Sequence, residues 1–258
     1  MAAGFRRYAT YRQATLAGAV TNTVFGVIKI SILFAAAASA AGGTVAGYDR
    51  AALSTYTWVS QGLIAVVWVF AWTPVADRVR TGDVAVDLGR PLHPVAAWLA
   101  EDLGRAGQAC LVRFTGPLVV GGLLYGLTVP TRLATLPLFV LSTALAVLVS
   151  FGGRLLVSLA AFWLTDVRGL LRLHMFAVNA LCGLLVPVHF LPGPVRVLAY
   201  ATPFPSIMQV PVDLVTERCT GAAALGQLGM QAGWAALLLA GCVWVFDRGS
   251  RRLVVQGG

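Results

Sequence analysis

Several runs of about 20 predominantly apolar residues constrain the fold of this chain more than any other feature of its sequence. A helix rises about 1.5 Å per residue, so a run of about 20 residues crosses the roughly 30 Å hydrocarbon core of a bilayer. Of the 258 residues, 58% are hydrophobic and only 11% are charged, far from the roughly 25% charged residues of soluble domains. The sequence therefore predicts an all-α integral membrane protein, with residues 1–258 forming a single transmembrane domain.

Six segments are long and apolar enough to be predicted spans. They lie at about 16–40, 53–74, 110–128, 136–163, 173–191 and 227–246. The first could also be read as a signal peptide, because arginines precede it and AAAASAA at its end resembles a cleavage site. Its length, well beyond the roughly 7 to 15 apolar residues of a signal peptide, favours a retained helix. The fourth is long for one straight crossing and contains Gly152 and Gly153, so the alternatives are a tilt, a kink at the glycine pair or a helix that runs past the membrane surface.

The arginines between the spans predict the orientation of the chain. The formal net charge of +9 would suggest a nucleic-acid partner in a soluble protein, but these arginines lie mainly in the predicted connections. If both termini are cytoplasmic, twelve arginines fall inside and four outside. The positive-inside rule requires this sense of asymmetry. We therefore expect cytoplasmic termini and no nucleic-acid partner.

The cytoplasmic connection 75–109 is more polar than the rest of the chain. Its stretch RTGDVAVDLGRPLHP, residues 80–94, holds four charges and two prolines between turn signals. From Val95 to Leu103, apolar residues recur at helical spacing, and charged residues take the opposite face: Glu101, Asp102 and Arg105. This pattern predicts an amphipathic helix along the inner membrane surface. An ordinary surface loop at 80–94 remains the alternative.

The external connection 192–220 is rich in proline and apolar residues. Prolines break it into apolar pieces that are each too short to span a membrane. We expect broken, re-entrant helices here, since such backbone is tolerated where protein or a water-filled cavity covers its polar groups. A loop packed on the outer surface is the alternative. Near the end of the segment, Asp213 and Glu217 either place two negative charges at an exit or, in the favoured interpretation, form a solvated helix face.

The residues that catalysis would require are not present in a recognisable pattern. The only lysine, Lys29, lies within a predicted span, so no phosphate-binding GxxxxGK[ST] loop exists and the chain is not expected to hydrolyse ATP. His93, His174 and His189 fall in different segments, outside any HExxH or GxSxG pattern. The four cysteines show no metal-ligand spacing. The sequence thus predicts neither an enzyme nor a metal site.

Polar side chains within the predicted spans are candidates for a transport pathway. A charged group at mid-membrane costs about 2.5 to 3.5 kcal/mol even on lenient scales, so Lys29 and Arg154 are functional candidates. Gln61 and Asn179 could add to a polar lining. The alternatives are that the charged side chains snorkel or neutralise a neighbour, and that the amides bond to adjacent helices.

Two motifs and their order resemble a known family. The first follows the second span and consists of Arg80, Gly82, Asp83, Asp87, Leu88, Arg90 and Pro91. The second lies between the fifth and sixth spans and includes Pro187, Pro203, Phe204 and Pro211. Together with the ending RRLVVQGG, they resemble the membrane subunit of a type-2 ABC exporter, a permease related to antibiotic and drug efflux components. The resemblance covers nearly the whole chain.

This resemblance implies a function and a set of partners. The first motif would dock on a separate ABC ATP-binding subunit, present in two copies, which binds the ATP and Mg while this chain binds no cofactor. A second permease chain, the same or related, would complete the pathway for an exported small molecule of hydrophobic or amphiphilic character. The complex would lie in the bacterial inner membrane, in contact with membrane lipids. The second motif, with Asp213 and Glu217, would form the external gate. An ATP-independent secondary transporter or channel is the main alternative, and a membrane enzyme is a weaker one.

Overall fold

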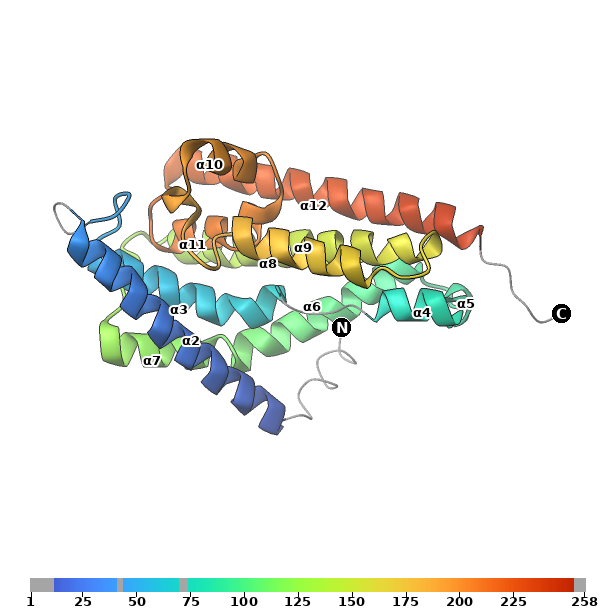
Figure 1. Ribbon diagram of the computed structural model, residues 1–258, viewed down its shortest axis with the longest axis horizontal. Helices are drawn as coiled ribbons and strands as arrows, with labels where there is room; N and C mark the ends of the chain where they lie inside the picture. Colours follow the sequence, from blue (N-terminus) through green and yellow to red (C-terminus); the bar gives the residue numbers. More distant parts are fainter. Residues whose placement is uncertain (1–11, 41–43, 70–73, 253–258) are drawn as a thin grey trace.

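The computed structural model describes residues 12–40, 44–69 and 74–252 (Figure 1). Regular secondary structure in these residues is helical, apart from one isolated bridge between Val45 and Tyr48. The α-helices are α2 (Arg12–Ser39), α3 (Arg50–Val67), α4 (Val75–Thr81), α5 (Val84–Leu88), α6 (Pro94–Val112), α7 (Thr115–Tyr125), α8 (Thr135–Ser158), α9 (Arg168–Leu181), α10 (Gly193–Tyr200), α11 (Gln209–Val215) and α12 (Gly221–Ser250). Three short 3-10 helices accompany them: η2 (Leu159–Phe162), η3 (Val188–Phe190) and η4 (Phe204–Ser206).

Within the residues that the structure describes, four helical runs are long and apolar enough to cross a membrane. They are Ala17–Ser39, Pro94–Tyr125, Thr135–Phe162 and Gly221–Ser250. The first, third and fourth of these match the predicted spans 16–40, 136–163 and 227–246 closely. The predicted spans 53–74 and 173–191 are helical only in part, because α3 ends at Val67 and α9 contains 14 residues. The chain is therefore an all-helical membrane protein, and the predicted count of six spans is not confirmed.

Helix α3 lies at the centre of the bundle. Fourteen of its eighteen residues are buried, and it packs against α2, α6, α7 and α8. Some of its hydroxyl groups bond within the helix, as when Thr57 Oγ1 donates to the Leu53 carbonyl at 2.8 Å and Ser60 Oγ donates to the Thr57 carbonyl at 2.9 Å. Ser54 Oγ instead donates to the Gly126 carbonyl at 2.7 Å, outside the helix. Such polar side chains lower the hydropathy of α3, and burial among other helices is what makes them acceptable.

Helices α8 and α12 form the other main contact of the bundle. Both begin near α10 and run toward the end that holds α4 and α5 (Figure 1). Helix α8 continues without a break through Gly152 and Gly153. A Cβ atom added at Gly152 would lie 2.8 Å from the Cβ of Leu238. This glycine therefore permits a close approach of α12, and the expected kink is not needed to explain it.

The two ends of the bundle differ in their elements. Helices α4 and α5 and the last turns of α12 lie at one end, which we call the α5 end (Figure 1). Helices α10 and α11 lie at the opposite end, which we call the α10 end (Figure 1).

Candidate functional site

The polar stretch 80–94 folds into a compact unit at the α5 end. Helix α4 ends at Gly82, whose left-handed backbone (φ 81°) lets the chain reverse into α5 without strain. Asp87 is buried, and its carboxylate lies 2.8 Å from Arg78 and 3.7 Å from Arg90. The buried carboxylate thus holds helices α4 and α5 and the following turn in one arrangement.

Helix α5 divides its apolar side chains between the core and the surface. Val84 is fully buried in a cluster that includes Phe151 of α8. Val86, Leu88 and Leu92 remain 63%, 44% and 53% exposed. Exposed apolar groups on a rigid unit are typical of a surface that another protein covers.

The remaining residues of the first motif surround this exposed surface. Arg80, Asp83, Arg90 and Pro91 are all exposed, and Thr81 Oγ1 donates to the Asp83 carboxylate at 2.7 Å. The structure therefore brings the residues of the first motif together, with Asp87 turned inward and the others available at the α5 end.

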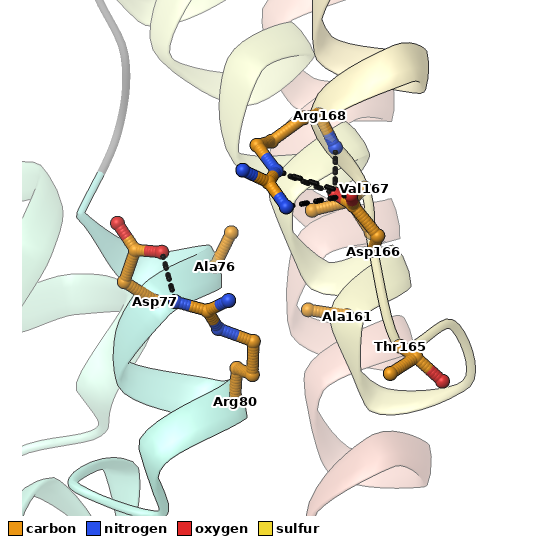
Figure 2. A pocket seen from close by; sticks show the side chains of 8 residues that line it. All are labelled: Ala76, Asp77, Arg80, Ala161, Thr165, Asp166, Val167 and Arg168. Carbon is orange, nitrogen blue, oxygen red and sulfur yellow. Dashed lines mark hydrogen bonds and ion pairs between the residues drawn. The ribbon is translucent and has the colours of Figure 1, made fainter.

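A polar pocket of about 260 Å³ lies between α4 and the connection that precedes α9 (Figure 2). Asp77 and Arg80 face it from α4, 3.5 Å apart, and Asp166 and Arg168 form an ion pair of 2.9 Å on the other wall. Hydrogen bonds from the Arg168 side chain, and then from its backbone, lower the pKa of Asp166 below its usual value. Within the described residues, no group of three or more His, Cys, Asp or Glu side chains could hold a metal ion.

Arg154 lies in a buried ion cluster and not in an open pathway. Its Nη2 lies 3.1 Å from Asp102 Oδ2, and Arg105 Nε donates to Asp102 Oδ1 at 2.8 Å. Both guanidinium groups lie over the ring of Trp68, at 4.3 Å for Arg105 and 5.3 Å for Arg154. We call Trp68, Asp102, Arg105 and Arg154 the inner cluster.

The inner cluster also binds the backbone carbonyls at the C-terminus of helix α3. Arg105 donates from Nη1 to the carbonyl of Ala65 at 2.7 Å and from Nη2 to the carbonyl of Val66 at 2.9 Å. The next carbonyl, of Val67, accepts from Ser150 Oγ at 2.6 Å. Carbonyls at a helix C-terminus have no partner within the helix, so these bonds allow α3 to end inside the bundle.

The charged face predicted for 95–109 is therefore not a surface feature. Helix α6 packs against α3 and α8, and Asp102 and Arg105 are buried. The prediction that Asp102 and Arg105 lie on a surface face is therefore wrong, whereas Glu101 of the same face is exposed; the position of this helix along the membrane surface stays a prediction. The carboxylate of Asp102 lies between the guanidinium groups of Arg105 and Arg154, and these two ion pairs make its burial possible.

Lys29 and Gln61 line an apolar groove of about 510 Å³ between α2, α3 and residues 184–186. Lys29 Nζ donates to Ser60 Oγ at 3.0 Å and to the Leu184 carbonyl at 2.6 Å. Asn22 Nδ2 donates to the backbone carbonyl of Gln61 at 3.3 Å. The side-chain oxygen of Gln61 is buried without a partner among the described residues. The lining of the groove is therefore apolar apart from a few polar side chains, among them Lys29 and Gln61.

Asn179, the fourth predicted lining residue, lies outside this groove. Its Nδ2 donates to the carbonyl of Met175 in its own helix at 2.8 Å. Of the four candidates, the structure thus brings Lys29 and Gln61 together, and places Arg154 and Asn179 elsewhere.

At the α10 end, Gln209 is the centre of a buried hydrogen-bond network. Its side-chain oxygen accepts from the Val188 amide at 2.8 Å and from the Tyr56 hydroxyl at 3.0 Å. Its Nε2 donates to Asp213 Oδ1 at 2.8 Å and to the Tyr48 hydroxyl at 3.2 Å. Sequence analysis missed Gln209, because no local pattern distinguishes it from other amides.

Asp213 belongs to the same network. It is 7% exposed, and its Oδ2 lies 2.9 Å from His189 Nε2. Arg218 lies 3.9 Å from its other oxygen and stacks over the ring of Tyr48 at 3.7 Å. The favoured interpretation of Asp213 as part of a solvated face is therefore wrong. We call Tyr48, Tyr56, His189, Gln209 and Asp213 the outer network.

Glu217 joins the end of α11 to the start of α8. It accepts from the hydroxyls of Thr131 and Thr135, both at 2.7 Å, and from the backbone amides of Thr131 at 3.0 Å and Arg132 at 2.8 Å. The Thr131 and Thr135 hydroxyls, followed by the Arg132 amide, lower the pKa of Glu217 to about 2. Glu217 is thus a connecting residue and does not belong to a solvated helix face.

The prolines of the second motif separate the short helices at the α10 end. Pro187 precedes η3, Pro203 precedes η4, whose first residue is Phe204, and Pro211 lies in the first turn of α11. The first turn of a helix tolerates proline, because the missing N–H has no partner there. The ring of Phe204 also contacts the ring of His174 in α9, at 5.9 Å.

Comparison with known proteins gives one match. The sequence model of a family described as ABC-2 family transporter protein matches residues 25–257. The matched part contains the α5 end, the groove beside Lys29, the inner cluster and the outer network. No curated protein and no solved structure matches the chain.

Proposed function

The chain belongs to the ABC-2 transporter family, and we propose that it is the permease subunit of an ATP-driven exporter of a hydrophobic or amphiphilic compound. Members of this family are membrane components of transporters and are not themselves catalytic. A separate ATP-binding subunit would bind ATP and Mg and supply the energy. The observation that carries this proposal is the exposed apolar surface on a rigid polar unit at the α5 end.

The coupling surface consists of Val86, Leu88 and Leu92, surrounded by the charged residues of the first motif. A unit transmits motion only if it does not deform, and the ion pairs of buried Asp87 with Arg78 and Arg90 supply this rigidity. The apolar side chains would enter a groove of the ATP-binding subunit, and Arg80, Asp83 and Arg90 would set the orientation.

The groove beside Lys29 is the best-supported place for the transported compound. Its lining is mainly apolar, with Lys29 and Gln61 as the polar contacts. Binding sites for small molecules commonly combine apolar walls with a few polar groups that fix orientation. Helix α2 exposes apolar side chains beside the groove, including Val24, Phe25 and Ile28, and a second permease chain, the same or related, would cover them.

The family and the burial of α3 and α11 support the following membrane topology. Helices α3 and α9 would cross together with the four longer runs, since α3 lies inside the bundle and needs no apolar outer face. Helices α10 and α11 would re-enter the outer half of the membrane, where the outer network satisfies their connections. The arginine distribution favours cytoplasmic termini in a bacterial inner membrane, with two ATP-binding subunits at the α5 end.

Substitution of the coupling surface tests the proposal. The double variant Val86→Asp, Leu88→Asp should reduce retention of the ATP-binding subunit on the tagged chain by more than about tenfold, because charged groups would replace apolar anchors. Since both side chains are exposed, Tm in detergent should not change. Leu133→Asp, at an exposed position before α8, is the matched control. Equal retention by the double variant and the control would remove the coupling role from α5.

A further inference from the structure

A second pocket at the α5 end has a lining that the coupling role does not use. Its volume is about 320 Å³, room for about ten water molecules at roughly 30 Å³ each. It lies beside the pocket of Figure 2 and shares Arg80, Ala161 and Thr165 with it. The lining residues are Val79, Arg80, Ala161, Phe162, Trp163, Leu164, Thr165 and Arg252.

The lining carries two positive charges and no carboxylate. Arg252 lies 5.8 Å from the ring of Trp163, and it has no carboxylate within 4.0 Å among the residues that the structure describes. Arg80 meets Asp77 at 3.5 Å, where both side chains are more than half exposed, so this ion pair is weak. The Thr165 hydroxyl is a third donor on the wall. Two guanidinium groups with a hydroxyl form a suitable set of donors for a phosphate group.

The position of the pocket relates it to the membrane surface. The apolar run Thr135–Phe162 ends at the pocket, and the next two residues, Trp163 and Leu164, are exposed. Tryptophan is enriched at the level of lipid headgroups. Arg248 stacks on Trp244 at 4.6 Å near the end of α12, which adds positive charge at the same level. A phosphate held here would therefore have acyl chains beside the apolar surface of the bundle.

We propose that this pocket binds the phosphate of an anionic phospholipid from the leaflet at the α5 end. Basic pockets on the cytoplasmic side of membrane proteins recognise such headgroups. Arg80 and Arg252 contact the phosphate, Thr165 donates a further hydrogen bond, and Trp163 lies against the glycerol and the upper acyl chain. The lipid then joins α4 to the end of α12, so the lipid composition of the membrane acts on the unit that carries the coupling surface. This site does not depend on the proposed export function.

Lipid binding to the purified full-length chain tests the site. The probes are phosphatidylglycerol and phosphatidylcholine, titrated in mild detergent and counted by native mass spectrometry. We expect selective binding of phosphatidylglycerol, and about fivefold weaker binding in Arg252→Gln, as expected for the loss of one arginine near the surface. Arg251→Gln is the matched control, because it removes the same charge from an adjacent exposed position that does not line the pocket.

Three results would overturn the proposal. The first is equal affinity of the wild-type chain for the two lipids. The second is an equal loss of affinity in Arg252→Gln and Arg251→Gln, which would indicate diffuse attraction without a site. The third is displacement of the lipid by millimolar inorganic phosphate, which would assign the pocket to a soluble anion. Circular dichroism and Tm of both variants, expected to equal those of the wild type, separate binding from folding.

Discussion

The inner cluster and the outer network solve the same problem with different chemistry. Each satisfies backbone groups that an interruption of helix leaves free inside the bundle: the C-terminal carbonyls of α3 in one case, and the Val188 amide before η3 in the other. The inner cluster uses three charged side chains around Trp68. The outer network uses mainly neutral groups, with Asp213 as its buried carboxylate. The inner cluster should therefore be the harder of the two to open, since opening it exposes unbalanced charge to an apolar interior.

Removal of the central carboxylate of the inner cluster should have the largest effect. Asp102→Ala leaves the guanidinium groups of Arg105 and Arg154 buried without this counter-charge. Loss of one partner from a buried ion pair costs about 3–5 kcal/mol. We expect a large fall in Tm and in the yield of folded protein in detergent. Asp166→Ala, which breaks an exposed ion pair with Arg168 and a bond to the Arg168 backbone amide, is the control and should lower Tm much less. An Asp102→Ala variant with the same Tm as the wild type would show that the inner cluster does not stabilise the fold.

Loss of the central amide of the outer network should have an intermediate effect. Gln209→Leu leaves the Val188 amide and the Tyr48 hydroxyl without their present bonds to Gln209. A buried polar group without a partner costs about 1–3 kcal/mol. Denaturation in detergent should therefore show a smaller loss of stability for Gln209→Leu than for Asp102→Ala. Asn179→Leu, whose amide bonds to its own helix, should change stability by less than about 0.5 kcal/mol. If Gln209→Leu proves the more damaging variant, the distinction between the two clusters fails.

The smallest effect concerns the pH dependence of stability at the α10 end. The pKa of Glu217 is lowered from 4.5 to about 2, so its bonds to the start of α8 stabilise the fold fully above pH 4.5. This contribution is lost as the pH falls from 4.5 toward 2. We expect Glu217→Gln to lower Tm at neutral pH, and the difference from the wild type to shrink across this window. A difference in Tm that is independent of pH would contradict the role of the ionised carboxylate.

The length and apolarity of single segments were sufficient to predict three long helical runs. The predicted spans 16–40 and 136–163 match Ala17–Ser39 and Thr135–Phe162 to within one residue, and 227–246 lies within Gly221–Ser250. In each case the apolar run itself determines the helix, so no knowledge of distant contacts is needed.

The inner cluster and the outer network depend on contacts between distant residues, which periodicity does not reveal. Asp102 and Arg105 looked like a surface face because Arg154, the second ion-pair partner of Asp102, lies 52 residues beyond it. Apart from Asp213, the partners of the Gln209 side chain lie 21 to 161 residues away. The helical run that contains the predicted third span begins at Pro94, and the prediction placed its start at 110. The prediction began too late because the charged residues of α6 indicated a surface helix.

The first motif was predicted as a unit, but the roles within it were not. Its turn residues correctly predicted a break at Gly82. Asp87 was expected to orient a partner, and the structure instead buries it against Arg78. Helical geometry in α5 turns Val84 and Asp87 inward and leaves Val86 and Leu88 exposed. Every second residue from Val84 to Leu88 is apolar, and this alternation does not predict such a division.

Purification of the tagged wild-type chain from gently solubilised native membranes tests the central claim most directly. Co-purifying proteins would be identified by mass spectrometry, and vanadate-sensitive ATPase activity would be measured in the same fraction. We predict an ABC ATP-binding subunit in near-equal amount to the total permease, together with that activity. A chain that purifies alone and without ATPase activity would contradict an ATP-driven permease and favour an ATP-independent transporter.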